Sequence, residues 1–464
     1  MIEQPRVGVL PLYLALYDKV RPESRPQVEA FARRVADRLE ASGLGVQLAP
    51  VCCVRAEIEA ALAGLLTGGL DLLATLHLAY SPSLETVDAL AGVDLPLLLL
   101  DTTPSRCFGA DATMDDMFAS HGIHGVQDLA CMLRRRAARY CLAVGHVDDP
   151  AFAAQVERTA RAAHAARHLR SSKVLVFGDE FRGMGDFAVS PDVLALRLGA
   201  EMHRVRMSDL ARRVRQVTDD QLAAEEAEDR ERFDLSAVSA EVLRASNQVG
   251  LALRGLLDRE GASAFSFNFQ SFDGARGVPT VPFLEASKAM ARGVGYAGEG
   301  DALTAALLAG LLQGFGDATF TEMFCPDWEG GAIFMSHMGE CNVALAAERP
   351  RLVEKSYAFG DVESPVVAIF PLRPGQATLV NIAPGPQDTF DLLAARVEVL
   401  DRGPQPGFPD VPHFWVRPTD TDLPGFLRWY SQCGGTHHLG LVLGDHVQAI
   451  AVMARVAAIG FQSP

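Results

Sequence analysis

The first third of the chain alternates short apolar runs with longer stretches in which apolar residues recur every three or four positions. Four of the runs have the length of a β-strand: residues 7–10, 46–51, 70–76 and 95–100. The stretches between them have the periodicity of amphipathic helices, most clearly over residues 26–42. This alternation is typical of βαβ units, in which helices cover both faces of a parallel sheet. Because ligands of such sheets lie beyond the carboxyl ends of the strands, we expect site loops after Leu10, Leu76 and Leu100.

A second unit of the same kind begins with the apolar run 173–177, which the loop 179–185 follows. Beyond about residue 318, strand-length apolar runs are separated by proline, glycine and aspartate, a pattern that indicates an antiparallel β or an α+β domain. We therefore predict an α/β protein in which two parallel-sheet, Rossmann-like domains precede a β-rich domain. The predicted domains are residues 1–170 (N-terminal α/β), 171–318 (central α/β) and 319–464 (C-terminal β-rich).

Composition and charge narrow the class of protein. Of 464 residues, 49% are hydrophobic and 22% are charged, so the chain can bury more than one large core. The formal net charge of −16 disfavours nucleic acid and anionic membranes as partners. The chain has no secretory signal pattern and no apolar run of the roughly 18–20 residues that span a bilayer. Its eight cysteines form no C-x-x-C pair, so we predict reduced thiols and a location in the cytoplasm.

One nucleotide-binding pattern is present, but its context is wrong. Gly293, Gly295 and Gly298 fit G-x-G-x-x-G, a signature that has meaning only after a strand and before a helix. Here the pattern follows a predicted helix over residues 281–292, and we interpret Gly293 as the stop of that helix. The sequence contains neither a P-loop nor a G-x-S-x-G nucleophile elbow.

Four short segments carry a stronger chemical signal. Glu299 lies between two glycines, Glu322 interrupts an apolar run, His337 ends an apolar strand, and His437 and His438 follow a glycine turn. Taken singly, each fits a solvated carboxylate or a histidine that only satisfies local hydrogen bonds. Taken together, two carboxylates and two imidazoles suit Mn²⁺, Co²⁺ or Mg²⁺ better than a structural zinc. On an extended strand neighbouring side chains point to opposite sides, so we expect His437 to point away from His438 or to support the site from behind.

The same segments resemble those of L-arabinose isomerases. The similar segments are residues 277–307 with Gly298-Glu299-Gly300-Asp301, 319–322, 336–340 and 434–438. They occur in the family's order and with similar spacing. The resemblance implies that Glu299, Glu322, His337 and His438 bind a divalent metal, with Mn²⁺ expected and Co²⁺ or Mg²⁺ as alternatives.

The resemblance also implies an architecture and a partner. L-Arabinose isomerases have two stacked α/β domains and a β-rich C-terminal domain, and they assemble into homo-trimers or homo-hexamers with sites at subunit boundaries. A small-molecule sugar is then the substrate, and His124 is expected to reach it across such a boundary. The candidate sugar-binding residues are Tyr13, Tyr17, His124, Met184, Phe269 and His437.

The chain departs from the family where the sugar is expected to bind. In place of the family's Gly-Ser-Gln-His-Leu-Tyr loop it has an apolar segment over residues 10–17, and Met323 and Phe324 replace Asp-Tyr after Glu322. The substrate is therefore either an arabinose-like pentose or another sugar, such as a fuco-, galacto- or four-carbon sugar. A non-catalytic sugar-binding protein is the alternative of another class, and the absence of an export signal disfavours it.

Aldose–ketose isomerisation moves a proton between adjacent carbon atoms through an enediolate, whose negative charge needs stabilisation. The resemblance and the carboxylate pair together suggest Glu299 and Glu322 as the catalytic acid and base. A metal-assisted hydride shift is the alternative route, and the sequence does not separate the two.

Overall fold

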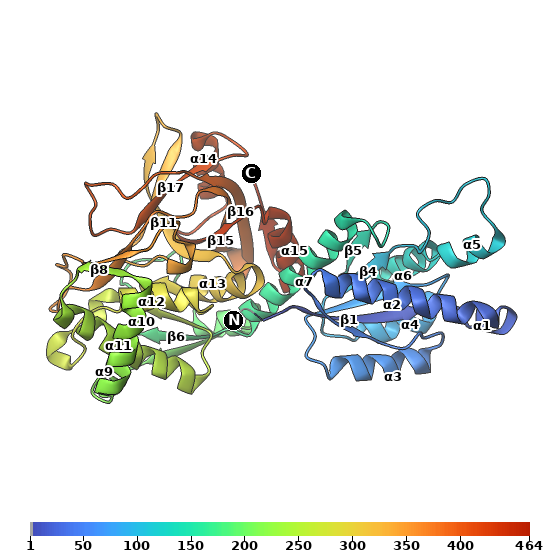
Figure 1. The fold of residues 1–464 in the computed structure, drawn as a ribbon, viewed down its shortest axis with the longest axis horizontal. Helices are drawn as coiled ribbons and strands as arrows, with labels where there is room; N and C mark the ends of the chain where they lie inside the picture. Colours follow the sequence, from blue (N-terminus) through green and yellow to red (C-terminus); the bar gives the residue numbers. More distant parts are fainter. Residues whose placement is uncertain (1–2) are drawn as a thin grey trace. The chain divides into compact units, whose positions relative to one another are not determined.

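The computed structural model describes residues 3–464, which form two compact units, Glu3–His164 and Ala165–Pro464 (Figure 1). The boundary between the units lies inside one long helix, α7 (Pro150–Arg170). The predicted fold class is confirmed, because two parallel-sheet α/β regions precede a β-rich C-terminal region. The predicted division of the second unit at residue 318 stays a prediction. Among the described residues, no helix is long and apolar enough to cross a membrane.

The first unit is a parallel sheet with the strand order β2-β1-β3-β4-β5. Its strands are β1 (Arg6–Leu12), β2 (Gly45–Leu48), β3 (Leu72–His77), β4 (Leu97–Asp101) and β5 (Cys141–Val144). Its helices are α1 (Ala15–Val20), α2 (Arg25–Ala41), α3 (Arg55–Leu66), α4 (Ser83–Ala91), α5 (Met114–Ser120), α6 (Ile123–Arg135) and α7. Every residue of β3 is buried, which explains why a strand covered on both faces is a continuous apolar run in the sequence. β5 was not predicted, because it is four residues long and its side chains alternate between buried and exposed.

The α/β part of the second unit has a parallel sheet with the order β10-β9-β6-β7. Its strands are β6 (Lys173–Phe177), β7 (Glu201–Val205), β9 (Ala264–Phe267) and β10 (Gly295–Gly298). Its principal helices are α9 (Met207–Val214), α10 (Asp219–Arg232), α11 (Ala240–Glu260), α12 (Phe283–Ala291) and α13 (Ala302–Phe315). Gly293 follows α12 with φ 85°, a left-handed conformation that ends the helix, and Gly295–Gly298 is a buried strand. The G-x-G-x-x-G pattern is therefore a helix stop followed by a strand.

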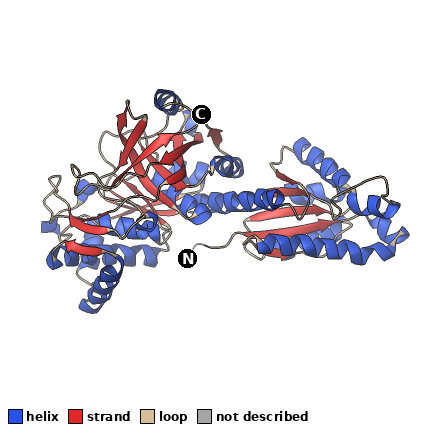
Figure 2. Ribbon diagram, turned by 45° about the horizontal axis from the view of Figure 1, so that its top comes forward, coloured by secondary structure: helices blue, strands red, loops and turns tan. Residues whose placement is uncertain are grey.

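The C-terminal part is built on a seven-stranded sheet with the order β15-β18-β11-β12-β17-β16-β19, in which β15 also pairs with β16 and closes the sheet into a barrel-like form (Figure 2). Its strands are β11 (Ala318–Asp327), β12 (Ala332–Ser336), β15 (Gly375–Pro384), β16 (Phe390–Val399), β17 (His413–Pro418), β18 (His438–Leu443) and β19 (Gly460–Gln462). A small sheet joins β8 (Asp234–Ala237), β13 (Arg351–Glu354) and β14 (Val366–Ile369), and the helices are α14 (Leu423–Gln432) and α15 (Val447–Ala457). β11 lies between β12 and β18, so the residues at one end of these three strands lie side by side.

A buried group of charges fixes α12, the helix that leads into β10. Lys288 on α12 is 1% exposed, and its Nζ lies 2.9 Å from a carboxylate oxygen of Glu225 and in direct contact with Asp229. Arg254 on α11 pairs at 2.9 Å with both Glu225 and Glu285. These ion pairs lower the pKa of Glu225 to about 2, although burial alone would raise it. α10, α11 and α12 are therefore joined by charges that are compensated only when all of them are present.

Replacing Lys288 with methionine should destabilise the protein by about 3–5 kcal/mol, because two carboxylates would stay buried without their shared cation. Chemical denaturation followed by circular dichroism measures the change. Arg206→Met is the matched control: the Arg206 side chain is 82% exposed and pairs with Asp209 at the surface, so its loss should cost less than about 1 kcal/mol. Equal effects of the two substitutions would contradict a buried, mutually compensated network.

Candidate metal centre

Glu299 is held in an unusual backbone conformation directly after β10. Its φ is 62°, in the left-handed region that side-chain-bearing residues rarely adopt. Its backbone N–H donates to the carbonyl of Phe267 at 2.8 Å, and its carbonyl accepts from the N–H of Phe181 at 3.0 Å. Gly298 and Gly300 on either side allow close approach of neighbouring groups. Strain of this kind persists where surrounding contacts enforce it, which is typical of functional sites.

The register of three strands places the other candidate residues. Glu322 on β11 lies directly opposite His438 on β18 and opposite Ser336 on β12. Side chains of directly paired residues share one face of an antiparallel sheet. His337 follows Ser336, and its ring centroid lies 5.5 Å from that of His438. Segments far apart in the sequence therefore meet at one end of the sheet, beside the Glu299 turn.

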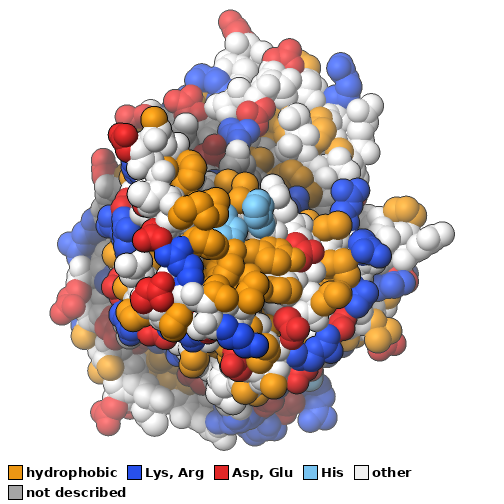
Figure 3. Space-filling view, turned by 90° about the vertical axis from the view of Figure 1, so that its right-hand side faces the viewer, with side chains coloured by type: hydrophobic (Ala, Val, Ile, Leu, Met, Phe, Trp, Pro, Cys, Tyr) orange, Lys and Arg blue, Asp and Glu red, His pale blue; other side chains and the backbone are white. Residues whose placement is uncertain are grey.

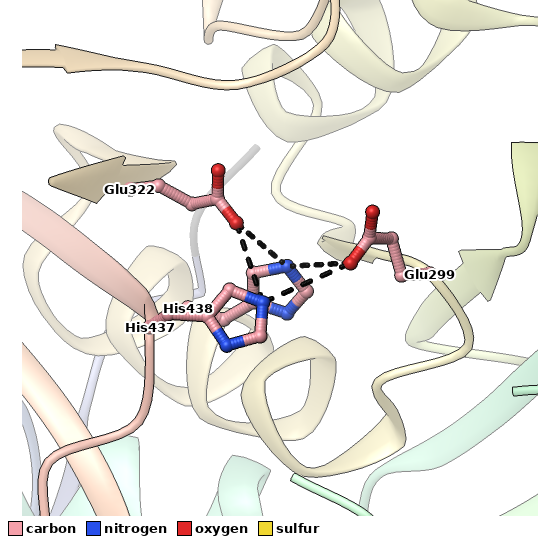
Figure 4. A group of neighbouring side chains, drawn as sticks. All are labelled: Glu299, Glu322, His437 and His438. Atoms are coloured by element: carbon pink, nitrogen blue, oxygen red, sulfur yellow. Dashed lines mark ion pairs between the residues drawn. The ribbon is translucent and has the colours of Figure 1, made fainter. Parts of the chain in front are cut away.

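Four side chains converge there on one point (Figure 4). Nε2 of His438 lies 3.2 Å from Oε1 of Glu322 and 3.6 Å from Oε2 of Glu299. Nε2 of His437 lies 3.5 Å and 3.8 Å from the same two oxygens. All four ligand atoms lie within 4.8 Å of one another. Oε2 of Glu299 and Nε2 of His438 are buried, and neither has a hydrogen-bond partner among residues 3–464.

Carboxylates behind the buried histidines fix which nitrogen faces the centre. Nδ1 of His438 lies 2.9 Å from Oδ2 of Asp301, whose other oxygen caps α13. Nδ1 of His337 lies 2.7 Å from Oε2 of Glu340, and Oε1 of the same carboxylate accepts a hydrogen bond from the hydroxyl of Tyr296. A carboxylate in this position accepts the Nδ1–H proton and leaves the Nε2 lone pair free. Metal-binding histidines are commonly held in this way.

The local charges favour a cation. Burial lowers the pKa of His438, but the facing carboxylates of Asp301 and Glu322 outweigh it and raise the pKa to about 9. The nearby carboxylates of Glu299 and Asp186 likewise outweigh burial and raise the pKa of His437 to about 9. For Glu322, burial raises the pKa, but the nearby histidines outweigh it and leave the pKa lowered. The point between the carboxylates therefore attracts positive charge, which either protons on the rings or a metal ion can supply.

The donor set fits a divalent metal ion. It combines two carboxylate oxygens with imidazole nitrogens that have free lone pairs and, within the group, no thiolate, which suits Mn²⁺ or Co²⁺. The tight group contains His437 in addition to His438, whereas His337 lies beside it, against Gly298. We expected His437 to point away from His438 or to support the site from behind. It instead lies in a bend before β18, so the alternation of an extended strand does not govern its direction.

The candidate sugar-binding residues fall in both units. Met184 and Phe269 lie near Phe181, whose N–H bonds the Glu299 carbonyl: Met184 N donates to Phe181 O, and the Phe269 ring is 5.7 Å from that of Phe181. Tyr13, Tyr17 and His124 belong to the first unit. There the Tyr13 and Tyr17 rings are 6.0 Å apart, and the Tyr17 hydroxyl bonds His121, whose ring lies 5.5 Å from that of His124.

An apolar area with histidines is visible on one face (Figure 3). The exposed apolar residues of α1, α5 and the start of α6 are Leu16, Val20, Met114, Met117 and Ile123.

Sequence reasoning missed the carboxylates that hold the histidines. Asp301 has two roles in the structure, because one carboxylate oxygen caps α13 and the other holds Nδ1 of His438. Glu340 stands three residues after His337, and this spacing is the one local signal that could have paired them. Asp186 had no such signal, because it bonds His437 from the loop after β6.

Comparison with known proteins gives a consistent result. Residues 173–313 match the family model for the L-arabinose isomerase central domain, and residues 317–460 match the one for the L-arabinose isomerase C-terminal domain. An L-arabinose isomerase from Nocardioides sp. is 30% identical over 457 residues, covering 93% of this chain and 89% of the relative. Those from Mycolicibacterium smegmatis (27% over 440 residues; 89% and 84% covered) and Herpetosiphon aurantiacus (25% over 409 residues; 84% and 80% covered) are also similar.

Gly298→Ala should damage the centre without unfolding the protein. A Cβ atom at this position would lie 2.5 Å from Cε1 and 2.8 Å from Nε2 of His337, which is buried and tied to Glu340, so the ring would have to move. We expect Mn²⁺ affinity, measured by isothermal titration calorimetry, to fall roughly 10- to 100-fold, the effect of disturbing a ligand's orientation. Gly64→Ala is the matched control, since a Cβ there meets no atom within 4 Å. Unchanged affinity in Gly298→Ala would show that the position of His337 does not matter to the metal.

Proposed function

This chain belongs to the L-arabinose isomerase family, a family of sugar aldose–ketose isomerases, and we propose that within it the chain acts on a free sugar with the help of a divalent metal. The proposed ligands are Glu299, Glu322, His337 and His438, with Mn²⁺ as the expected ion and Co²⁺ or Mg²⁺ as alternatives. One observation carries the proposal. Oε2 of Glu299 and Nε2 of His438 are both buried and lie 3.6 Å apart, and neither has a hydrogen-bond partner among the described residues. Such an arrangement is costly unless a positive charge lies between the two atoms.

The two glutamates divide the proton transfers in the proposed mechanism. The bound metal ion would supply a Lewis acid that stabilises negative charge developing on the sugar oxygens. One carboxylate accepts the proton from the carbon next to the carbonyl and returns it to the carbonyl carbon. The other moves the hydroxyl proton between the two oxygens. Glu299, held rigidly by its backbone contacts, and Glu322, fixed by strand register, can keep these positions while the sugar reacts.

The natural sugar is an open part of the proposal. An arabinose-like pentose is one candidate, and a fuco-, galacto- or four-carbon sugar is the other, because Leu10–Tyr17 and Met323-Phe324 depart from the family at the expected sugar contacts. A trimer or hexamer in the cytoplasm, with His124 reaching the site at a subunit boundary, is proposed on the family resemblance. A non-catalytic sugar-binding protein is the alternative that activity assays would exclude.

Glu299→Gln and Glu322→Gln should each lower kcat by roughly 10²- to 10⁴-fold, because each removes a proton acceptor and a negative ligand. Ketose formation from a panel of pentoses, hexoses, 6-deoxy sugars and tetroses, with Mn²⁺ present, measures the effect. A chelator should abolish the wild-type activity, and added Mn²⁺ should restore it. Glu201→Gln is the control, since Glu201 is an exposed strand residue outside the centre. Sugar binding without turnover for every sugar and metal tested would instead favour the binding-protein alternative.

Solvent exchange separates proton transfer from a hydride shift. If Glu299 or Glu322 carries the proton between carbon atoms, part of it should exchange with solvent, and a reaction in D₂O should place deuterium on the product carbon. Nuclear magnetic resonance or mass spectrometry of the ketose detects the label. A product formed in D₂O without any carbon-bound deuterium, at every extent of reaction, would support the hydride shift instead.

A further inference from the structure

His437 stands in the same geometrical relation to the two glutamates as His438 does. Its Nε2 is 3.5 Å from Oε1 of Glu322 and 3.8 Å from Oε2 of Glu299, compared with 3.2 Å and 3.6 Å for His438. For bonds of about 2.1 Å, neighbouring donors of one ion lie roughly 3.0–3.4 Å apart. The 3.2 Å separation already lies in this range, and the other three need to contract only slightly for both histidines to bind the same ion.

Asp186 fixes the orientation of His437. One oxygen of its carboxylate, Oδ2, accepts from the backbone N–H of His437 at 2.9 Å and lies 2.7 Å from Nδ1 of the ring. The two contacts fix both the backbone and the ring of His437, and they leave Nε2 directed at the glutamates. Asp301 and Glu340 hold His438 and His337 in the same way. His437 thus has a carboxylate partner on the ring nitrogen that does not face the glutamates, as metal-binding histidines commonly do.

The residue after Asp186 contacts the same pair of rings. Phe187 is buried and stacks on His438, with ring centroids 4.9 Å apart and an angle of 9° between the planes. Its ring also lies 5.5 Å from that of His437. Asp186 and Phe187 belong to the loop after β6, whose Phe181 bonds the carbonyl of Glu299. One loop therefore supports a glutamate and both neighbouring histidines.

The geometry points to His437 as a third imidazole ligand of the metal in the sugar-free enzyme, positioned by Asp186. This inference rests on the proposed metal dependence and adds a ligand to the set that the family resemblance implies. The side chain of His437 is 38% exposed, whereas that of His438 is fully buried. His437 is thus the ligand that a sugar oxygen can displace, which gives the sugar a place on the ion. Three imidazoles also favour Mn²⁺ or Co²⁺ over Mg²⁺.

Counting imidazole nitrogens on bound Mn²⁺ tests the inference directly. The full-length protein, with ¹⁵N-labelled histidine and without sugar, is loaded with Mn²⁺ and studied by pulsed electron paramagnetic resonance. We expect His437→Ala to remove one imidazole coupling and to raise the Kd for Mn²⁺, measured by titration calorimetry, roughly 10- to 100-fold. Asp186→Ala should weaken binding in the same range, and Asp186→Asn less, because its amide oxygen can still accept from Nδ1.

His203→Ala is the matched control, because His203 also pairs with a carboxylate, Glu201, at 3.1 Å but lies exposed on β7. It should leave both the coupling count and the Kd unchanged. His437→Gln gives a second variant if the alanine protein does not fold. An unaltered nitrogen count and Kd in the His437 variants, with binding lost in His438→Ala, would overturn the inference and leave the proposed function intact. A wild-type protein that binds no Mn²⁺ would overturn both.

Discussion

Two carboxylates held within a few ångströms of each other, in a place mostly closed to water, repel one another and lose their hydration. Glu299 and Glu322 are in this situation, since their facing oxygens belong to a group of atoms within 4.8 Å. The arrangement is stable only where positive charge lies between them, which makes this constraint the one on which the site depends. The imidazoles of His437 and His438 supply part of this positive charge when they are protonated. Their pKa values are raised because the carboxylates stabilise the protonated rings.

The rest of the second unit supports this arrangement. The parallel sheet delivers Glu299 at the carboxyl end of β10, where its left-handed backbone is enforced by contacts from β9 and from the loop after β6. The barrel-like sheet delivers Glu322 and His438 as a cross-strand pair. Each histidine is in turn fixed by a carboxylate: Asp301, Glu340 or Asp186. The centre is therefore surrounded by carboxylates. Those behind the histidines increase the electron density on the ring nitrogens that face the point where a cation would bind.

The sequence predicted the larger features because they are repeated locally. Apolar runs marked β1 to β4 within a few residues, and the sequence context identified Gly293 as the stop of a helix and not as part of a nucleotide loop. β5 was not predicted because a run of only four residues, alternately buried and exposed, gives too weak a pattern. The direction of His437 was also not predicted, since the expectation assumed an extended backbone where the chain bends. Short or irregular segments take their conformation from tertiary contacts, which periodicity does not encode.

The sequence by itself determined the fold class and the chemical character of the centre, because hydrophobic periodicity and glycine-flanked Glu and His residues are properties of short segments. It also linked those segments to one family of isomerases. Only the tertiary structure decided which atoms face one another. Glu322 meets His438 through strand register, and Asp186 meets His437 across 251 residues of chain. Such pairings depend on how sheets close and where loops return, and no local pattern records them, because the free energy that selects them comes from packing and charge compensation in the whole folded unit.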